Sequence, residues 1–375
     1  MNKKEINEIK SLFTKIDDVA VERLCGCYVD GEKNIISTFN ESFLLLEKDE
    51  MYKYMEIFRK SLSGTQGKNL MDMSFTHETD GSKLLETMRS SELKDETVNK
   101  LFFDKIIETY DFPGEYLILV IFQRYDVPGI TDDGIKMEDA SDEVYSYILC
   151  SLCPIGVSKL GLGYYEETNE FHTLQQDKYV KLPENAFLYP AFNDRSTDTN
   201  SLLYYSAKGD RSEEKMLNEF LGVKAPLPAV EQKEIFDALV RETMTEGTDV
   251  ELVTAVQKNM AEMVLEKKQE SQGKPAVIQK EDVTAVLKQS GLQEEKVKNF
   301  SQRFDEEFGM DEAVQEIFAE NIVPSRSKLE MKTPDVVVKI NYDRTDLVET
   351  RIIDGKKCLV IELGEGLVIN GIPVQ

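Results

Sequence analysis

The sequence predicts an α+β protein, with a mixed α/β amino-terminal part, a helical middle and a small antiparallel sheet at the carboxyl end. Three observations support this class. β-prone runs and helical repeats alternate up to about residue 210, helical spacing of apolar residues dominates the next hundred residues, and short β-prone runs with Asp-Gly and Gly-Glu-Gly turns return from residue 333. We therefore expect three parts: a mixed α/β domain over 1–210, a helical domain over 211–325 and a β-rich segment over 326–375.

The first part opens with an amphipathic helix over residues 3–12, in which Ile6, Ile9 and Leu12 recur at helical spacing. A hairpin follows, because Asp30-Gly31 separates two β-prone runs and this dipeptide favours a tight turn. Apolar residues at three- and four-residue steps then predict a helix over residues 40–62, which Gly64 ends.

Two more helices are expected within residues 83–110. After Pro113-Gly114, the short apolar run at 116–122 predicts a buried strand that pairs with residues 144–152. The intervening residues 126–142 are rich in Asp, Glu, Gly and Pro, and they predict a solvated acidic loop without calcium-ligand spacing. A second strand pair is expected at 186–189 and 202–205.

The composition is strongly acidic. The chain of 375 residues has 70 acidic and 45 basic side chains and a net charge of −25. Because non-specific nucleic-acid binding depends on clustered Lys and Arg, direct binding to DNA or RNA would need a local basic face, and the sequence shows none longer than a few residues. The acidity itself favours solubility, and the alternatives are a basic partner or mimicry of nucleic-acid charge.

Several features favour the cytoplasm and a non-membrane protein. The longest apolar run, residues 117–122, is far shorter than the roughly 20 residues that a membrane-spanning helix needs. The amino terminus lacks the apolar stretch of a secretory signal peptide. Five cysteines in a chain of this length indicate free thiols in a reducing compartment.

Four of the cysteines have suggestive spacing: Cys25 and Cys27 form C-x-C, and Cys150 and Cys153 form C-x-x-C. Four thiolates could hold a structural zinc ion. On a strand, however, Cys150 and Cys153 would point to opposite faces, and the run around them is core-like. The preferred interpretation is four buried thiols and no cofactor, with zinc as the alternative.

The densest polar cluster lies between two expected strands and contains Asn193, Asp194, Arg195 and Asp198. These side chains could bind an anion or a nucleotide, or act as an acid/base pair, with Arg23 or Lys68 as additional anion contacts. The alternative is a turn that its own Asx hydrogen bonds and one ion pair stabilise. Nothing marks a Cys–His pair, because the two histidines, His77 and His172, both lie in polar segments.

Several runs resemble an uncharacterised bacterial family, domain-of-unknown-function family 4317. They include RLCGCYVDGEK at 23–33, YDVPG at 125–129, ASDEVY at 140–145, PAFNDRSTD at 190–198 and RTDLVETRIIDG at 344–355. The similarity runs from end to end, and it implies no activity. A weaker similarity to NdpA-type nucleoid-associated proteins covers the order of the parts, FLGV at 220–223 and LVINGIP at 367–373.

No motif has catalytic spacing, so our leading hypothesis is a non-enzymatic cytoplasmic protein that binds a protein partner, and the second similarity implies association with the nucleoid. An enzyme or anion-binding protein with its site at residues 193–198 is the alternative. Apolar stripes such as Val256, Met260 and Val264 are typical of a helical core, and self-association through such a stripe is the other interpretation.

Overall fold

The computed structural model describes most of the chain, namely residues 1–14, 21–76, 79–130, 136–173, 176–209, 213–223, 227–244, 250–271, 273–308, 317–322, 328–363, 368–369 and 372–373. The chain divides into two compact units, Met1–Pro228 and Ala229–Gln375. Each unit has its own architecture.

The first unit is built on an eight-stranded sheet with the order β2-β1-β4-β5-β9-β12-β3, in which β8 pairs with β5 outside this path. Every pairing in the sheet is antiparallel. The strands are β1 (Val21–Val29), β2 (Ile35–Ser42), β3 (Leu70–Ser74), β4 (Tyr116–Ile130), β5 (Lys136–Val157), β8 (Lys178–Val180), β9 (Asn185–Tyr189) and β12 (Ser201–Ser206).

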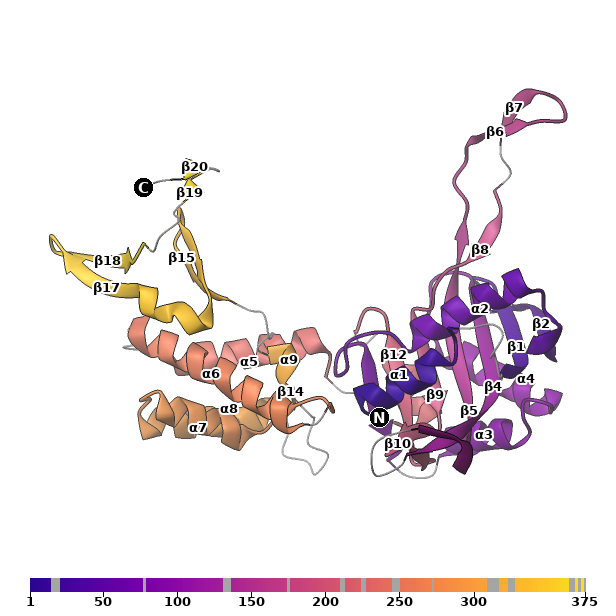
Figure 1. The fold of residues 1–375 in the computed structure, drawn as a ribbon, viewed down its shortest axis with the longest axis horizontal. Helices are drawn as coiled ribbons and strands as arrows, with labels where there is room; N and C mark the ends of the chain where they lie inside the picture. Colours follow the sequence, from indigo (N-terminus) through magenta and orange to yellow (C-terminus); the bar gives the residue numbers. More distant parts are fainter. Residues whose placement is uncertain are drawn as a thin grey trace. The chain divides into compact units, whose positions relative to one another are not determined.

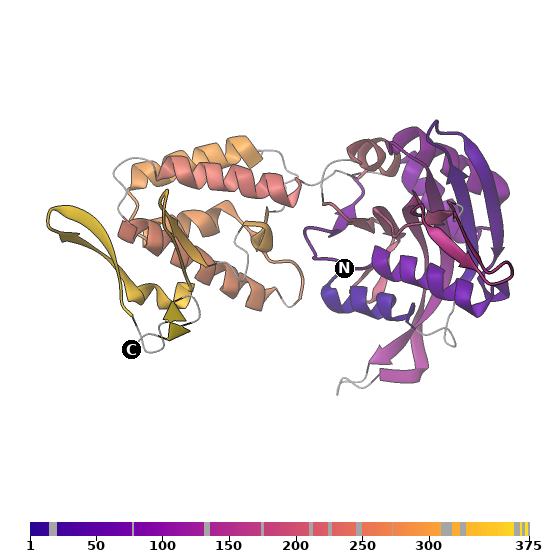
Figure 2. The same ribbon diagram turned by 90° about the horizontal axis from the view of Figure 1, so that it is seen from above.

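Helices cover both faces of this sheet (Figures 1 and 2). Successive side chains of a strand point to opposite faces, so Leu24 and Cys25 of β1 enter different cores. The core that contains Leu24 lies under α1 (Lys3–Ser11), the short helix η2 (Phe43–Leu45) and α2 (Lys48–Ser61). The core that contains Cys25 lies under α3 (Asp80–Ser90), α4 (Glu96–Thr109) and the π-helix η3 (Met216–Leu221).

The predicted helix over residues 40–62 forms only from Lys48 onward. Residues 40–42 extend strand β2, and the register pairs Ser42 with Arg23 of β1. The hydrogen bonds of this ladder therefore take precedence over the helical spacing of the apolar residues, as tertiary context often does.

The predicted acidic loop at 126–142 is wrong for the residues that the structure describes. Strand β4 continues to Ile130 and β5 begins at Lys136, and the two pair as a long ribbon that leaves the body of the sheet (Figure 2). The register shifts on either side of Pro128, which marks bulges in the ladder. Pairing with β5 satisfies the backbone here, although Pro128 and Gly129 are typical of loops.

Two small hairpins interrupt the connections of the sheet. The first consists of β6 (Leu162–Tyr165) and β7 (Glu170–Thr173), which lie at the end of an arm beyond β8 (Figure 1). The second consists of β10 (Ala191–Asn193) and β11 (Ser196–Asp198), between β9 and β12.

The second unit combines helices with two-stranded antiparallel sheets. Its core includes Val256, Met260 and Val264 of α6, in agreement with their helical spacing. The helices are α5 (Ala229–Thr243), α6 (Val250–Glu270), α7 (Lys280–Gln289), α8 (Glu294–Phe308), α9 (Ala319–Ile322) and η4 (Tyr342–Leu347). The strand pairs are β13 (Val277–Ile278) with β14 (Ile317–Phe318), β15 (Leu329–Lys332) with β16 (Val337–Ile340), β17 (Val348–Ile353) with β18 (Lys356–Ile361), and β19 (Val368–Ile369) with β20 (Ile372–Pro373).

The α+β class predicted from the sequence is confirmed. The carboxyl-terminal strands form separate pairs rather than one sheet. Among the described helices, none combines the length and the apolar character that crossing a membrane would require.

Candidate functional site

The polar cluster predicted at residues 193–198 forms the turn of the β10–β11 hairpin. Asn193 pairs with Ser196, and the two residues between them, Asp194 and Arg195, have φ values of 51° and 57°. Two consecutive residues with positive φ are typical of a type I′ turn, whose twist matches that of the flanking strands. The cluster is therefore compact, and its backbone is fixed by the hairpin.

Asp198 accepts hydrogen bonds from its own segment. Asn193 Nδ2 donates to Oδ2 over 2.8 Å, the backbone N–H of Asn200 donates to Oδ1 over 3.0 Å, and the Ser201 hydroxyl donates to Oδ2. Burial opposes ionisation of this carboxyl, but the hydrogen bonds from Ser201, Asn193 and Asn200 outweigh it and lower the pKa of Asp198. Asp198 is therefore an ionised acceptor that closes the hairpin.

Arg195 reaches the first helix through its guanidinium group. Its Nη2 donates to Glu8 Oε1 and to the carbonyl of Pro128, each over 3.0 Å. The Arg195 and Glu8 side chains are only 23% and 12% exposed. This contact ties α1 and the β4–β5 ribbon to the hairpin, and it supports the interpretation of residues 193–198 as a structural turn.

The four cysteines of the C-x-C and C-x-x-C pairs do not come together in the fold. Cys25, Cys27 and Cys150 lie in one core, whereas Cys153 lies on the opposite face of the sheet. Val120 of β4 pairs with both Cys25 and Cys150, so these two are separated by an intervening strand, roughly 10 Å. One zinc ion holds its sulfur ligands at about 2.3 Å, and the described residues contain no group of three or more His, Cys, Asp or Glu arranged for a metal.

Burial keeps these cysteines protonated. It raises the pKa of Cys25 and of Cys27 to about 12, and it also raises the pKa of Cys150 and of Cys153 well above that of a free thiol. The nucleophilic form of a cysteine is the thiolate, so none of the four is activated for catalysis.

The remaining predicted residues are dispersed. His77 lies outside the described residues, and His172 of β7 lies 3.1 Å from the Glu170 carboxylate. Arg23 donates to Asn40 Oδ1 on the neighbouring strand over 2.9 Å. Lys68 belongs to a turn in which the backbone amides of residues 67–70 donate to carbonyls of the same turn. That turn therefore presents no cradle of amides to a phosphate.

The sequence did not predict a long extension of the first unit, which we call the arm (residues 154–173 and 176–182). Its base is the pairing of β5 with β8, where Lys178 also reaches the Glu115 carboxylate over 2.8 Å. Its tip is the β6–β7 hairpin, and Figure 1 shows β6 and β7 far from the sheet. The signal in the sequence was the alternation of Leu160, Leu162 and Tyr164, which is too short to define a strand.

One face of the tip is apolar and uncovered. The register places Tyr164 opposite Phe171 and Leu162 opposite Thr173, all on the same face. Leu162, Tyr164 and Phe171 are 73%, 51% and 67% exposed, and the rings of Tyr164 and Phe171 touch with centroids 5.2 Å apart. An isolated two-stranded hairpin is at best marginally stable in water, so this face has the character of a contact surface.

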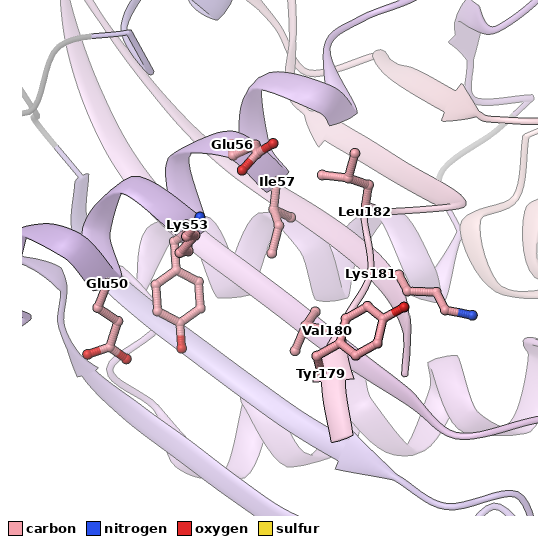
Figure 3. A pocket seen from close by; sticks show the side chains of 9 residues that line it. Glu50, Lys53, Glu56, Ile57, Tyr179, Val180, Lys181 and Leu182 are labelled. Carbon is pink, nitrogen blue, oxygen red and sulfur yellow. The ribbon is translucent and has the colours of Figure 1, made fainter. Parts of the chain in front are cut away.

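At the base of the arm lies a groove of about 730 Å³ between α2 and β8 (Figure 3), which we call the α2–β8 groove. Tyr54 and Ile57 of α2 line one side, and Val180 and Leu182 line the other. Lys53 and Lys181 also belong to its lining, together with Glu50, Glu56 and Tyr179. The groove thus combines apolar walls with two lysines and two glutamates.

Comparison with known proteins identifies the family. Neither the curated proteins nor the solved structures give a match to the chain. The family model described as a domain of unknown function (DUF4317) matches residues 1–372, which is essentially the whole chain. The chain therefore belongs to the DUF4317 family, as the runs quoted from its sequence predict.

Proposed function

We propose that this chain is a non-enzymatic assembly protein, and that its arm docks into the α2–β8 groove of a second copy. The observation that carries the proposal is the uncovered apolar face of Leu162, Tyr164 and Phe171 at the tip of the arm. In the described part of the chain, β6 pairs only with β7, so the outer edge of each strand is also open to a partner.

A second copy is the occupant that the surfaces favour. One arm carries the apolar tip and, at its own base, one wall of the groove. Two arms that run antiparallel therefore place each tip at the base of the other, and a single twofold contact covers both surfaces. A dimer therefore leaves no tip and no groove free for a third copy.

The tip of the arm is acidic, and the groove offers it two lysines among charges of both signs. The turn at the tip carries Glu166 and Glu167, with Glu170 at the start of β7, and all three are exposed. The groove carries Lys53 and Lys181 beside Glu50 and Glu56, so its charged lining residues balance. Pairs between the tip glutamates and the groove lysines help to set the register of the contact, and each exposed pair contributes only about 0–1 kcal/mol.

The test is the mass of the full chain by sedimentation equilibrium, from about 1 to 100 µM, the range over which complexes of moderate affinity form. We expect a dimer for the natural sequence and a monomer for a tip variant, Leu162→Ser with Phe171→Ser. A groove variant, Val180→Glu with Leu182→Glu, is also expected to be monomeric. Ile352→Ser, at a residue 80% exposed in the second unit, is the matched control and should leave the dimer intact.

Mixing the two variants gives the sharpest result. A heterodimer of tip and groove variants retains one intact contact, because the natural tip of one meets the natural groove of the other. We expect the mixture to dimerise where neither variant does alone. A monomeric natural chain, or a tip variant that dimerises like the natural chain, would contradict the proposal.

The NdpA-type similarity implies association with the nucleoid. On this proposal, the chain associates with the nucleoid by binding a basic protein, and not by binding DNA. The net charge of −25 supports this route, because it opposes the counterion release that drives binding to duplex DNA. Titration with duplex DNA at about 50 mM salt, where such binding is strong, is expected to show none. A measurable affinity there would overturn this part of the proposal.

A further inference from the structure

One edge of the sheet in the first unit is open. Strand β2 stands at the end of the strand order and, in the part of the chain that the structure describes, it pairs only with β1. Its first four residues are exposed, with Ile35 and Ile36 at 38% and 56%. Alternate residues of an edge strand direct their N–H and C=O groups away from the neighbouring strand. β2 therefore presents a row of backbone donors and acceptors to a partner.

The open edge also lacks the residues that usually protect edge strands. The run IISTF at 35–39 contains no charge and no proline, and most of its residues favour extended structure. In the whole of β2 the one charged residue is Glu41. A short segment of this kind readily pairs with another chain when it is uncovered. The edge therefore has the character of a binding surface.

A pocket of about 760 Å³ lies beside this edge, between β2 and α4, and we call it the α4 pocket. Its walls include Ile35, Thr38 and Asn40 of β2 and Glu96, Lys100 and Phe103 of α4. Thr38 pairs with Cys27 of β1, and Cys27 lies in the core under α4. The residues of β2 that share this face therefore look toward the helix.

Hydrogen bonds fix α4 in place beside the strand. The carbonyl of Leu93, just before α4, accepts from Asn40 Nδ2 over 3.0 Å and from Asn99 Nδ2 over 2.7 Å. Asn40 belongs to β2 and Asn99 to α4, so a single carbonyl joins the strand to the helix. The space between β2 and α4 is therefore preformed, which lowers the cost of binding.

An extended peptide fits this arrangement. A peptide strand that pairs with the open edge of β2 directs every second side chain to the face that α4 flanks, where the pocket can receive it. Ile35 and Phe103 offer apolar contact to such side chains. The backbone of the peptide then supplies affinity, and the pocket supplies selectivity for apolar residues at alternate positions.

The charges near the edge favour a basic segment. Glu32, before β2, and Glu41, near its end, are exposed, whereas Lys33 forms an ion pair of its own. Within the pocket lining, Glu96 and Lys100 offset each other. Basic residues at the two ends of a bound segment would complement the two exposed glutamates. A second copy would instead bring the same acidic edge against this one.

We propose that β2 and the α4 pocket bind an extended segment of a basic partner protein by strand addition. The open edge of β2 pairs with the backbone of the segment, and the pocket receives its apolar side chains. The choice of a basic protein rests on the proposed function. The arm takes no part in this site, so a monomeric natural chain would contradict the arm dimer and leave the outcomes below unchanged.

The probe is a synthetic peptide of eight residues, in which leucine and threonine alternate between a lysine at each end. Its affinity for the full chain would be measured by fluorescence anisotropy, and we expect a Kd of about 100 µM. The same peptide with a glutamate at each end should bind about tenfold more weakly, because like charges replace the two exposed ion pairs. Bound peptide should also slow hydrogen exchange of backbone amides within residues 35–42.

Two variants locate the peptide. Thr38 lines the pocket, so Thr38→Trp should fill it and weaken binding at least about tenfold. Ser37 pairs with Tyr28 and lies on the opposite face of the strand, so Ser37→Trp is the matched control and should bind like the natural chain. Both positions are exposed, so both variants should fold, which circular dichroism and the melting temperature check.

Four outcomes would overturn the proposal. They are no binding at about 1 mM peptide, binding without slower exchange in β2, equal effects of the two tryptophans, and loss of a natural dimer in Thr38→Trp. The last would show that a second copy occupies the edge.

Discussion

Arg195 Nη2 donates to Glu8 Oε1 over 3.0 Å, and this ion pair joins a turn near the middle of the chain to the first helix. The Tyr125 hydroxyl donates to the same oxygen over 2.7 Å. Because both charged side chains are mostly buried, removal of one leaves the other poorly solvated and without its partner. The pair therefore predicts a large effect on stability.

We expect Arg195→Met to lower the free energy of unfolding by about 2–4 kcal/mol, and Glu8→Gln by a similar amount. Because the two substitutions remove one contact, the double variant should lose at least about 1 kcal/mol less than the sum of the single variants. Urea unfolding of the three variants measures this coupling. Strict additivity would show that Arg195 does not act through Glu8, and it would favour the anion-binding interpretation of residues 193–198.

Asp198 predicts a dependence of stability on pH. Its pKa in the folded chain is below the value of about 3.9 for an unfolded aspartate, because hydrogen bonds from Ser201, Asn193 and Asn200 outweigh its burial. The stabilisation is therefore fully present above about pH 5 and is lost as the pH falls through the folded-state pKa. Asp198→Asn removes this contribution.

The natural chain should consequently be more stable than Asp198→Asn at pH 6, and the difference should shrink toward pH 3. Chemical unfolding at several pH values gives the two curves. Ser201→Ala removes one donor to Asp198 Oδ2, so its free energy of unfolding should lie between those of the natural chain and Asp198→Asn. A difference that stays constant from pH 6 to pH 3 would show that ionisation of Asp198 does not contribute.

The sequence predicted those elements whose residues carry their own signal. The strand at 116–122 is continuous and apolar, and the Asp30-Gly31 turn is specific, so both were correctly placed. The extension of β4 through Pro128 and Gly129 was missed, because only pairing with β5 makes these residues part of a strand. Local sequence does not encode that partner.

In the candidate sites, too, the features that depend on distant parts of the chain could not be predicted from local sequence. Asn99 lies in the helical stripe of Phe102, Phe103 and Ile106, so its burial was visible in the spacing. The hydrogen bond from Asn99 Nδ2 to the carbonyl of Leu93 was not visible, because it depends on where the left-handed turn at Leu93 places that carbonyl. The arm was missed because its apolar residues Leu162 and Phe171 are exposed, whereas an apolar pattern in a sequence is read as a buried core.

The thiols predict a simple pattern of reactivity. In the native chain, Cys358 is partly exposed, whereas Cys25, Cys27, Cys150 and Cys153 are buried. With a pKa of about 12, only about 10⁻⁴ of Cys25 or Cys27 is thiolate at pH 8. Ellman's reagent should therefore react rapidly with one of the five cysteines, and with all five in guanidinium chloride.

Two controls separate burial from metal protection. Cys358→Ser should abolish the rapid native reaction, and a chelator should leave the slow reaction of the other four unchanged. Acceleration by the chelator would show that a metal protects these thiols, in favour of the zinc alternative.

The close packing of α3 on η3 leaves no room for a side chain at Gly81. A Cβ at this position would lie 1.8 Å from the carbonyl oxygen of Phe220, which is backbone and cannot rotate away. Gly81→Ala should therefore force α3 and η3 apart and lower the free energy of unfolding by about 2–3 kcal/mol. Gly31→Ala is the control, because a Cβ added at Gly31 would meet nothing within 4 Å, and its effect should stay within about 0.5 kcal/mol. Equal effects of the two substitutions in guanidinium chloride unfolding would show that the backbone of η3 does not approach Gly81 this closely.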